Sequence, residues 1–201
     1  MRSYGQYCAV AKGLDVIGDR WSLLIVRELL LRGPSRYTEL LHGLPGIATN
    51  LLADRLRDLE AAGVVTRADG AFALTPRGLE LESVLRAIGR WGAPLLAQAD
   101  ADDVFQSHWL AFPLRELLTD HAPSRPPRTL EVQTGDAAVT VEVGNGAVRI
   151  RPGQADDADA TLAGPVRQLL PVLAGRVPLA RARGVRFEGD RAVLRRLQPR
   201  A

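Results

Sequence analysis

The chain has 201 residues, of which 46% are hydrophobic, enough for one or two domains with buried cores. Its net charge is only +3, which excludes a strongly basic tail as the source of nucleic-acid binding. No apolar run approaches the roughly 20 residues of a membrane span, the first residues lack an apolar signal segment, and one cysteine excludes an internal disulfide. We therefore expect a cytoplasmic protein without a membrane partner.

Helices are predicted along the first 45 residues. Residues 8–17 have apolar side chains at helical spacing, and residues 21–32 are apolar on nearly every side. The second of these helices should therefore lie at the centre of a first core. Gly33-Pro34 ends it, and we expect Ser35 to cap the next helix, which buries Tyr37 and the leucines that follow.

The stretch from Gly46 to Thr75 predicts a longer helix and a β-hairpin. Leu52, Leu56 and Leu59 recur at intervals of four and three, the spacing of one helical face. Gly63 ends the helix, and Asp69-Gly70 is typical of a tight turn between two strands. Together with the preceding helices this predicts a winged helix-turn-helix. The alternative is an ordinary core helix with a surface hairpin.

A winged helix would place the polar side of that longer helix in a DNA groove. Thr49 and Asn50 stand at its entry, where side chains usually reach base edges, and Arg57 should reach phosphate or a guanine. The candidate DNA-binding residues are Arg36, Thr38, Thr49, Asn50, Ala53, Arg57 and Arg67.

Two alternatives concern the arginines of this helix. Arg57 could instead be a solvated arginine paired with Glu60 or Asp54. Arg55 ranks below Arg57 as a DNA contact, because it could instead be a structural residue that leans back toward Glu28 or Glu39.

A long helix is predicted to begin at Pro76 and to continue past Trp91. Its apolar stripe is the candidate homodimer interface, and the alternative is packing within one chain. The residues predicted for this interface, from the long helix and from the first helix, are Leu81, Val84, Leu85, Ile88, Trp91, Val10, Leu14 and Ile17.

The period of the pattern changes from helical to strand-like in the second half. Residues 97–103 are small and polar and indicate a domain boundary. A helix that is kinked or split at Pro113 and a proline-rich linker at 122–128 precede short alternating strands. The sequence thus predicts an α+β protein with a winged-helix domain at 1–99, a helical segment and linker at 100–127, and a second domain at 128–201.

The first half resembles the HxlR family of bacterial transcription regulators, which are relatives of the MarR proteins. The resemblance covers residues 6–97 and is carried by C-A-V-A-K-G-L-D-V-I-G-D-R-W-S-L-L-I-V-R-E-L from Cys8, G-P-S-R-Y-T-E-L from Gly33 and L-P-G-I from Leu44. It implies a homodimer whose two winged helices bind a palindromic or near-palindromic operator in double-stranded DNA. The chain departs from the family at its short wing, where Arg67 is the one basic residue.

The second half resembles the sterol carrier protein 2 fold over residues 128–198. Asp159-Ala-Thr-Leu, Leu173-Ala-Gly175 and Gly184-Val-Arg-Phe-Glu-Gly-Asp190 carry the resemblance. It implies an apolar tunnel that takes a lipid-like small molecule, and the alternative is a closed domain with a filled core. Our candidate lining residues are Trp109, Phe112, Leu169, Leu170 and Leu173.

Nothing in the sequence indicates an enzyme, a metal site or a cofactor. Its three histidines are far apart, and it has no glycine-rich phosphate loop. Cys8 begins an apolar helix, and we expect a buried structural sulfur there rather than a redox switch. The hypothesis is a homodimeric repressor modulated by an apolar effector. The alternative is an apolar-ligand carrier whose winged helix serves dimerisation only.

Overall fold

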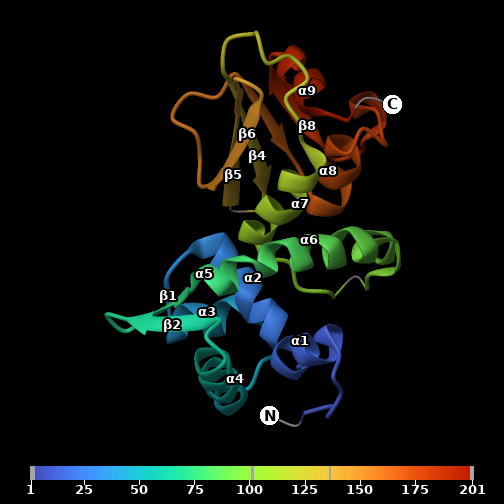
Figure 1. Ribbon diagram of the computed structural model, residues 1–201. Helices are drawn as coiled ribbons and strands as arrows, with labels where there is room; N and C mark the ends of the chain where they lie inside the picture. Colours follow the sequence, from blue (N-terminus) through green and yellow to red (C-terminus); the bar gives the residue numbers. More distant parts are fainter. Residues whose placement is uncertain (1–2, 101, 136, 200–201) are drawn as a thin grey trace. The chain divides into compact units, whose positions relative to one another are not determined.

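Helices dominate the first half of the chain and strands the second half (Figure 1). The computed structural model describes residues 3–100, 102–135 and 137–199. It divides the chain into two compact units, Met1–Val104 and Phe105–Ala201, hereafter the N-terminal and C-terminal units.

The N-terminal unit is a winged helix-turn-helix. Its described helices are α1 (Ala9–Ile17), α2 (Ser22–Arg32), α3 (Tyr37–Gly43), α4 (Thr49–Ala61), α5 (Pro76–Leu79), α6 (Leu81–Gly92) and the 3₁₀ helix η1 (Ala93–Gln98). A small antiparallel sheet joins β1 (Ser35–Arg36), β2 (Val65–Ala68) and β3 (Ala71–Leu74) in the order β1-β3-β2. The β2–β3 hairpin is the wing, and both Asp69 and Gly70 have the positive φ that its tight turn requires.

The core of this unit confirms the predicted role of α2. Ile25 and Val26 of that helix have no exposed surface. Leu40 of α3 and the three leucines at the predicted spacing in α4, Leu52, Leu56 and Leu59, are also almost fully buried. Helical spacing of apolar residues therefore predicted which face of each helix packs inward.

Two local predictions in this unit are wrong. Ser35 does not cap α3, because it lies in β1 opposite Phe72 and its hydroxyl donates a 3.0 Å hydrogen bond to the Gly33 carbonyl. Arg36 is the residue that precedes α3. The long helix expected from Pro76 is instead two helices that meet at Glu80. Gly78, inside the first of them, packs so close to the Val64 carbonyl that a side chain has no room.

The C-terminal unit has one five-stranded sheet with helices packed on it. Its strands are β4 (Arg128–Thr134), β5 (Ala137–Gly144), β6 (Ala147–Pro152), β7 (Ala160–Ala163) and β8 (Arg186–Gly189) in the order β6-β5-β4-β7-β8. Strands β4 and β7 are parallel, and the other neighbours are antiparallel. The described helices are η2 (Ser107–Leu110), α7 (Ala111–Leu117), α8 (Val166–Leu173), η3 (Leu179–Arg181) and α9 (Arg191–Leu197).

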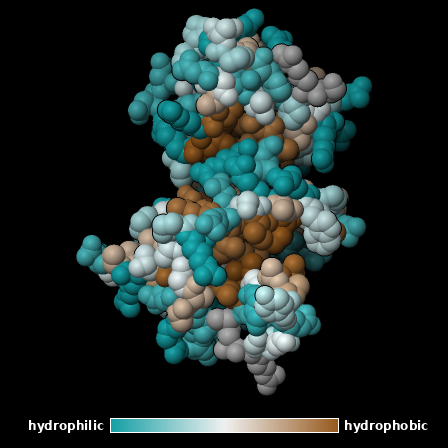
Figure 2. Space-filling model, in the orientation of Figure 1, coloured by the Kyte–Doolittle hydropathy of each residue, from teal (hydrophilic) through white to brown (hydrophobic). Residues whose placement is uncertain are grey.

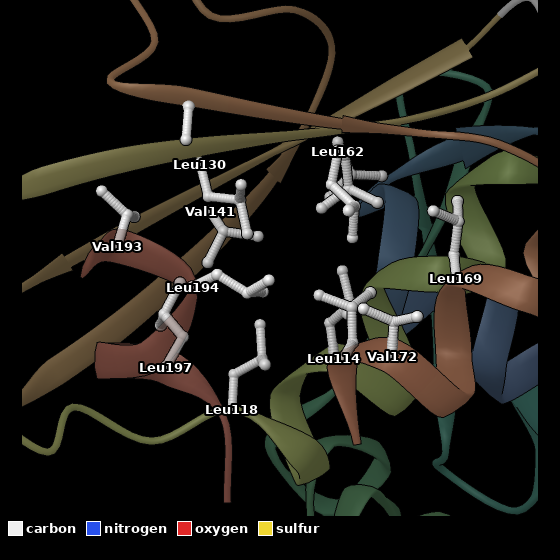
Figure 3. Close-up of a cluster of buried hydrophobic side chains, with 14 of the residues drawn as sticks. Leu114, Leu118, Leu130, Val141, Leu162, Leu169, Val172, Val193, Leu194 and Leu197 are labelled. Atoms are coloured by element: carbon white, nitrogen blue, oxygen red, sulfur yellow. The ribbon is translucent and has the colours of Figure 1, made fainter. Parts of the chain in front are cut away.

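The core of this unit lies between the sheet and α7, α8 and α9. Alternate residues of the strands, such as Leu130, Val141 and Leu162, point toward the helices (Figure 3). Leu114, Leu169 and Leu194 point back from the helices toward the strands. The fold class predicted from the sequence, α+β with a winged helix followed by a second domain of strands and helices, is therefore the one observed.

The segment between α7 and β4 belongs to the C-terminal unit. Asp120 and Arg196 form a buried ion pair in which two guanidinium nitrogens donate to the two carboxylate oxygens, at 2.8 and 3.0 Å. The same guanidinium also donates to the carbonyls of Pro126 and Arg125. The proline-rich linker is thus fastened to α9 by charged hydrogen bonds. Pro113 does not split α7 but lies in its first turn, where a missing N–H is tolerated.

Candidate nucleic-acid interface

Helix α4 separates a buried face from a polar face. Leu52, Leu56 and Leu59 pack into the core, while Thr49, Asn50 and Arg57 on the outer side are exposed. Ala53 and Asp54 between them are half-buried. The helix begins at Thr49 without a side-chain cap, so its first peptide N–H groups and the positive end of its dipole are open to an anion.

A hydrogen bond fixes the start of α4 against α3. The Tyr37 hydroxyl donates to the Thr49 carbonyl over 2.6 Å. Because Arg36 and Thr38 flank Tyr37, and Asn50 follows Thr49, the two exposed helix entries adjoin. The sequence predicted that Tyr37 belongs to the buried face of α3, but it did not predict this bond. A tyrosine on an otherwise leucine-rich buried face is a signal for such a bond, because its hydroxyl needs a hydrogen-bond partner.

Arg57 is the exposed cation of the α4 outer face. Its side chain is 74% exposed and forms an ion pair with Asp54, one turn earlier. Asp54 is one of the two partners that the sequence suggested for Arg57 as the alternative to a DNA contact. An exposed pair contributes about 0–1 kcal/mol, so the guanidinium can exchange the carboxylate for a phosphate at little cost.

Arg55 has a structural role, but its predicted partners are wrong. It forms ion pairs at 3.2 Å with Asp19, before α2, and at 3.2 Å with Asp58 of its own helix. Glu28 is instead buried against Arg27 and Arg32 of its own helix, at 2.9 and 3.3 Å. Charge type alone could not tell which carboxylate the fold brings to Arg55.

The wing presents Arg67 on an aromatic support. Its guanidinium carbon lies 5.2 Å from the ring centroid of Phe72, the residue opposite it on β3. This cation–π contact holds the charge above the hairpin while leaving Arg67 exposed. Arg67 lies in β2, which follows the end of α4 in the chain.

Apolar side chains gather on the N-terminal unit between α1 and α6 (Figure 2). Of the eight residues predicted for the homodimer interface, Leu85 is buried inside the unit, while Leu81, Val84 and Ile17 are half-buried. The exposed members are Val10, Leu14, Ile88 and Trp91, and η1 adds Leu95 and Leu96. The Trp91 side chain has the largest exposed fraction of these residues, 78%. We call these six residues the apolar stripe.

The predicted ligand-lining residues occupy two environments in the C-terminal unit. Leu169 and Leu173 have no exposed surface and belong to the core. Trp109, Phe112 and Leu170 are half-buried, and Trp109 packs edge-on against Phe105 with ring centroids 6.3 Å apart. A surface pocket in this unit has a different lining, which includes Ser107, His108 and Gly153. The tunnel lining stays a prediction.

Cys8 is exposed, so the expectation of a buried sulfur is wrong. The residue precedes α1, and the peptide N–H groups of Ala11 and Val10 lower the pKa of its thiol. The apolar pattern of α1 suggested burial, but that helix presents part of its apolar side to the surface.

In residues 3–100, 102–135 and 137–199, no group of three histidine, cysteine or acidic side chains could hold a metal ion. Within the same ranges, no helix is long and apolar enough to cross a membrane.

Known protein families match both halves of the chain. The HxlR-like helix-turn-helix family matches residues 16–100, and the SCP-2 sterol transfer family matches residues 128–200. An uncharacterized HTH-type transcriptional regulator of Synechocystis, sll1512, is 34% identical over 105 residues, which are 49% of this chain and 77% of the relative. The regulator YodB of Bacillus subtilis is 31% identical over 84 residues, 38% of this chain and 74% of the relative.

Solved structures also align with part of the chain. The crystal structure of quinone-bound YodB from B. subtilis aligns with 30% identity over 42% of this chain and 96% of its own, with a TM-score of 0.39.

The sequence relatives sll1512 and YodB are named as transcriptional regulators, a class of proteins that are not enzymes.

Proposed function

The chain belongs to the HxlR-like helix-turn-helix family of transcription regulators, and from that premise we propose that it is a homodimeric repressor that binds a palindromic operator. It would act in the cytoplasm, where the double-stranded DNA is. In each protomer, α4 enters the major groove and Thr49 and Asn50 meet base edges. Phosphates or flanking bases are bound by Arg57, Arg36, Thr38 and Arg67. Ala53 leaves room for a thymine methyl.

The observation that carries this proposal is the two-sided character of α4. Three leucines hold one side rigidly in the core, and the other side is exposed, polar and free of large side chains at its entry. The Tyr37–Thr49 bond fixes that entry against α3. A helix held in this way by a helix-turn-helix and flanked by a wing can present its start to a groove without rearrangement.

Dimerisation is proposed from the apolar stripe. Six large apolar side chains on α1, α6 and η1 are exposed, and a lone chain seldom leaves a contiguous surface of this kind in water. A second copy presents the same residues, so the two stripes can pack against each other around a twofold axis. The twofold axis of the protein then corresponds to the symmetry of the operator.

We also propose that an apolar small molecule binds the C-terminal unit and changes the affinity for the operator. The match to the SCP-2 sterol transfer family supports this proposal. Because Leu169 and Leu173 fill the core, entry of the molecule requires repacking of α8. Such an effector acts through the difference between its affinities for the DNA-bound and free forms. Native mass spectrometry of the purified protein tests it, since a co-purified apolar adduct is expected and an adduct-free protein contradicts it.

Hydroxyl-radical footprinting on DNA upstream of the protein's own gene tests the proposed function. A repressor dimer should protect two half-sites about 34 Å apart, centre to centre, one turn of the duplex. The Asn50→Ala variant should lose both footprints, and Gln168→Ala, an exposed amide side chain of α8, should keep them. A single protected half-site, or none with the folded parent, would contradict the dimer or the operator respectively.

A further inference from the structure

The segment that connects α8 to β8 has an unusual arrangement of charge. Residues 160–187 contain five arginines and neither aspartate nor glutamate. Four of these arginines fall within residues 176–186, which we call the arginine strap. They are Arg176, Arg181, Arg183 and Arg186, and all four are exposed.

The arginine strap has an apolar inner side and a basic outer side. Val177, Leu179, Ala182 and Val185 are half-buried and pack against the core of the C-terminal unit. The arginines alternate with them and therefore face outward. The segment is held at both ends: the N–H groups of Arg176 and Val177 donate to the Pro171 carbonyl at 2.9 and 3.1 Å, and Arg186 pairs with Ala163 of β7 in the sheet. Its charges are thus displayed on a folded surface rather than on a loose tail.

Nothing in the described part of the chain neutralises the four arginines. None of their side chains makes a hydrogen bond or an ion pair with the described residues. The next carboxylates are Glu188, which is exposed on the same face of β8, and Asp190, which caps α9 by accepting from the Ala192 N–H. Other arginines of this unit do have carboxylate partners: Arg151 pairs with Glu142 at 3.1 Å and Arg128 with Asp159 at 3.0 Å.

We propose that the arginine strap is a second DNA-binding surface that holds the phosphate backbone of the duplex without reading its sequence. Exposed guanidinium groups bind phosphate oxygens through planar pairs of N–H donors, which suits a repeating row of phosphates. The inference rests on the proposed function, because the winged helix supplies the duplex and tethers the strap to it. Tethering makes the second contact intramolecular, so even a weak surface adds affinity.

An anionic membrane is the other polyanion that four arginines could bind, and the inner side of the strap argues against it. Proteins that lie on a bilayer insert exposed apolar side chains between the head groups. Here the apolar residues of the strap face the core. Among the described residues of the C-terminal unit, Phe105 is the one large hydrophobic side chain that is classed as exposed, and it lies far from the strap in sequence.

The test compares the salt dependence of binding by the full-length chain to a random-sequence 40-bp duplex, measured by fluorescence anisotropy. The variant is Arg181→Gln/Arg183→Gln. The matched control is Arg149→Gln/Arg151→Gln, which removes the same charge from β6 of the same unit. Each phosphate contact contributes about 1 to the slope of log affinity against log salt, so the strap variant should have a slope shallower by about 2 per protomer. The control should keep the parent slope.

Each outcome decides the proposal. A strap variant with the parent slope and an unchanged melting temperature overturns it, as does a control that loses as much slope as the strap variant. Loss of binding to phosphatidylserine vesicles with an unchanged DNA slope would assign the strap to a membrane instead. The variant Thr49→Ala/Asn50→Ala separates the two claims. If it binds an operator fragment like the parent while the strap variant still loses slope, the base contacts proposed for Thr49 and Asn50 fail and the strap proposal stands.

Discussion

The hydroxyl of Tyr37, the first residue of α3, donates a 2.6 Å hydrogen bond to the carbonyl of Thr49, the first residue of α4. Both ends of this bond lie on the surface that we assign to DNA. The bond therefore sets the angle at which the entry of α4 is presented, although neither the hydroxyl nor the carbonyl is itself a predicted contact to a base.

The variant Tyr37→Phe should bind DNA less tightly while remaining folded. Removal of one hydrogen bond is worth about 0.5–1.5 kcal/mol, so affinity should fall roughly two- to tenfold as the start of α4 loosens. Fluorescence anisotropy with upstream DNA measures this effect. Tyr4→Phe, at an exposed tyrosine far from α4 in sequence, is the control. An unchanged affinity for Tyr37→Phe would mean that the bond has no part in positioning the helix.

The buried Asp120–Arg196 pair should make the C-terminal unit sensitive to acid. Hydrogen bonds from the Arg196 guanidinium hold the pKa of Asp120 well below its ordinary value. A depressed folded-state pKa stabilises the fold above the unfolded pKa of about 3.9, and this stability is lost as pH falls toward the folded value. Urea unfolding of the parent between pH 6 and pH 3 should therefore show a falling midpoint for this unit.

Substitution of one partner of this pair should be costly at neutral pH. Arg196→Met leaves the Asp120 carboxylate buried without its cation, and we expect a loss of about 3–5 kcal/mol. The double variant Asp120→Leu/Arg196→Met should recover much of that loss, because both charges are then absent. A single variant as stable as the parent, or a double variant worse than the single, would rule out a structural role for the pair.

The apolar stripe should control the oligomeric state. Trp91→Glu places a carboxylate where the proposed partner protomer packs, and the dimer dissociation constant should rise by roughly tenfold or more. Analytical ultracentrifugation over a range of concentrations measures this constant. Val104→Glu, at an exposed apolar residue outside the stripe, should leave it unchanged. A parent that is monomeric at all concentrations, or a Trp91→Glu variant that dimerises like the parent, would contradict the proposed interface.

Sequence reasoning succeeded where the signal is local. The spacing of Leu52, Leu56 and Leu59 predicted the buried face of α4, and Asp69-Gly70 predicted the turn of the wing. It failed where a long-range partner decides. Ser35 is a good helix cap in isolation, but pairing of β1 with β3 requires it in a strand, and two residues are too few to show a strand period.

The candidate DNA-binding residues of α4 could be selected from sequence because they lie opposite its buried leucines. Their supports could not be predicted, since the Tyr37–Thr49 bond and the Arg67–Phe72 contact depend on tertiary placement. The same holds for Arg55, whose partner Asp19 is 36 positions earlier in the chain. In the C-terminal unit, periodicity could not distinguish a core leucine such as Leu169 from a residue that lines a tunnel, because both are apolar and inward-facing.

The most direct test of the account is the affinity of full-length protein for a 30-bp upstream duplex, with the parent compared with Thr49→Ala/Asn50→Ala/Arg57→Ala at 50 and 200 mM salt. We expect the parent to bind and to weaken steeply with salt, since phosphate contacts release counterions. The triple variant should bind at least tenfold more weakly at both salt concentrations, with its melting temperature unchanged, because the three side chains are exposed. A folded triple variant that binds as tightly as the parent would contradict the claim that the outer face of α4 meets DNA.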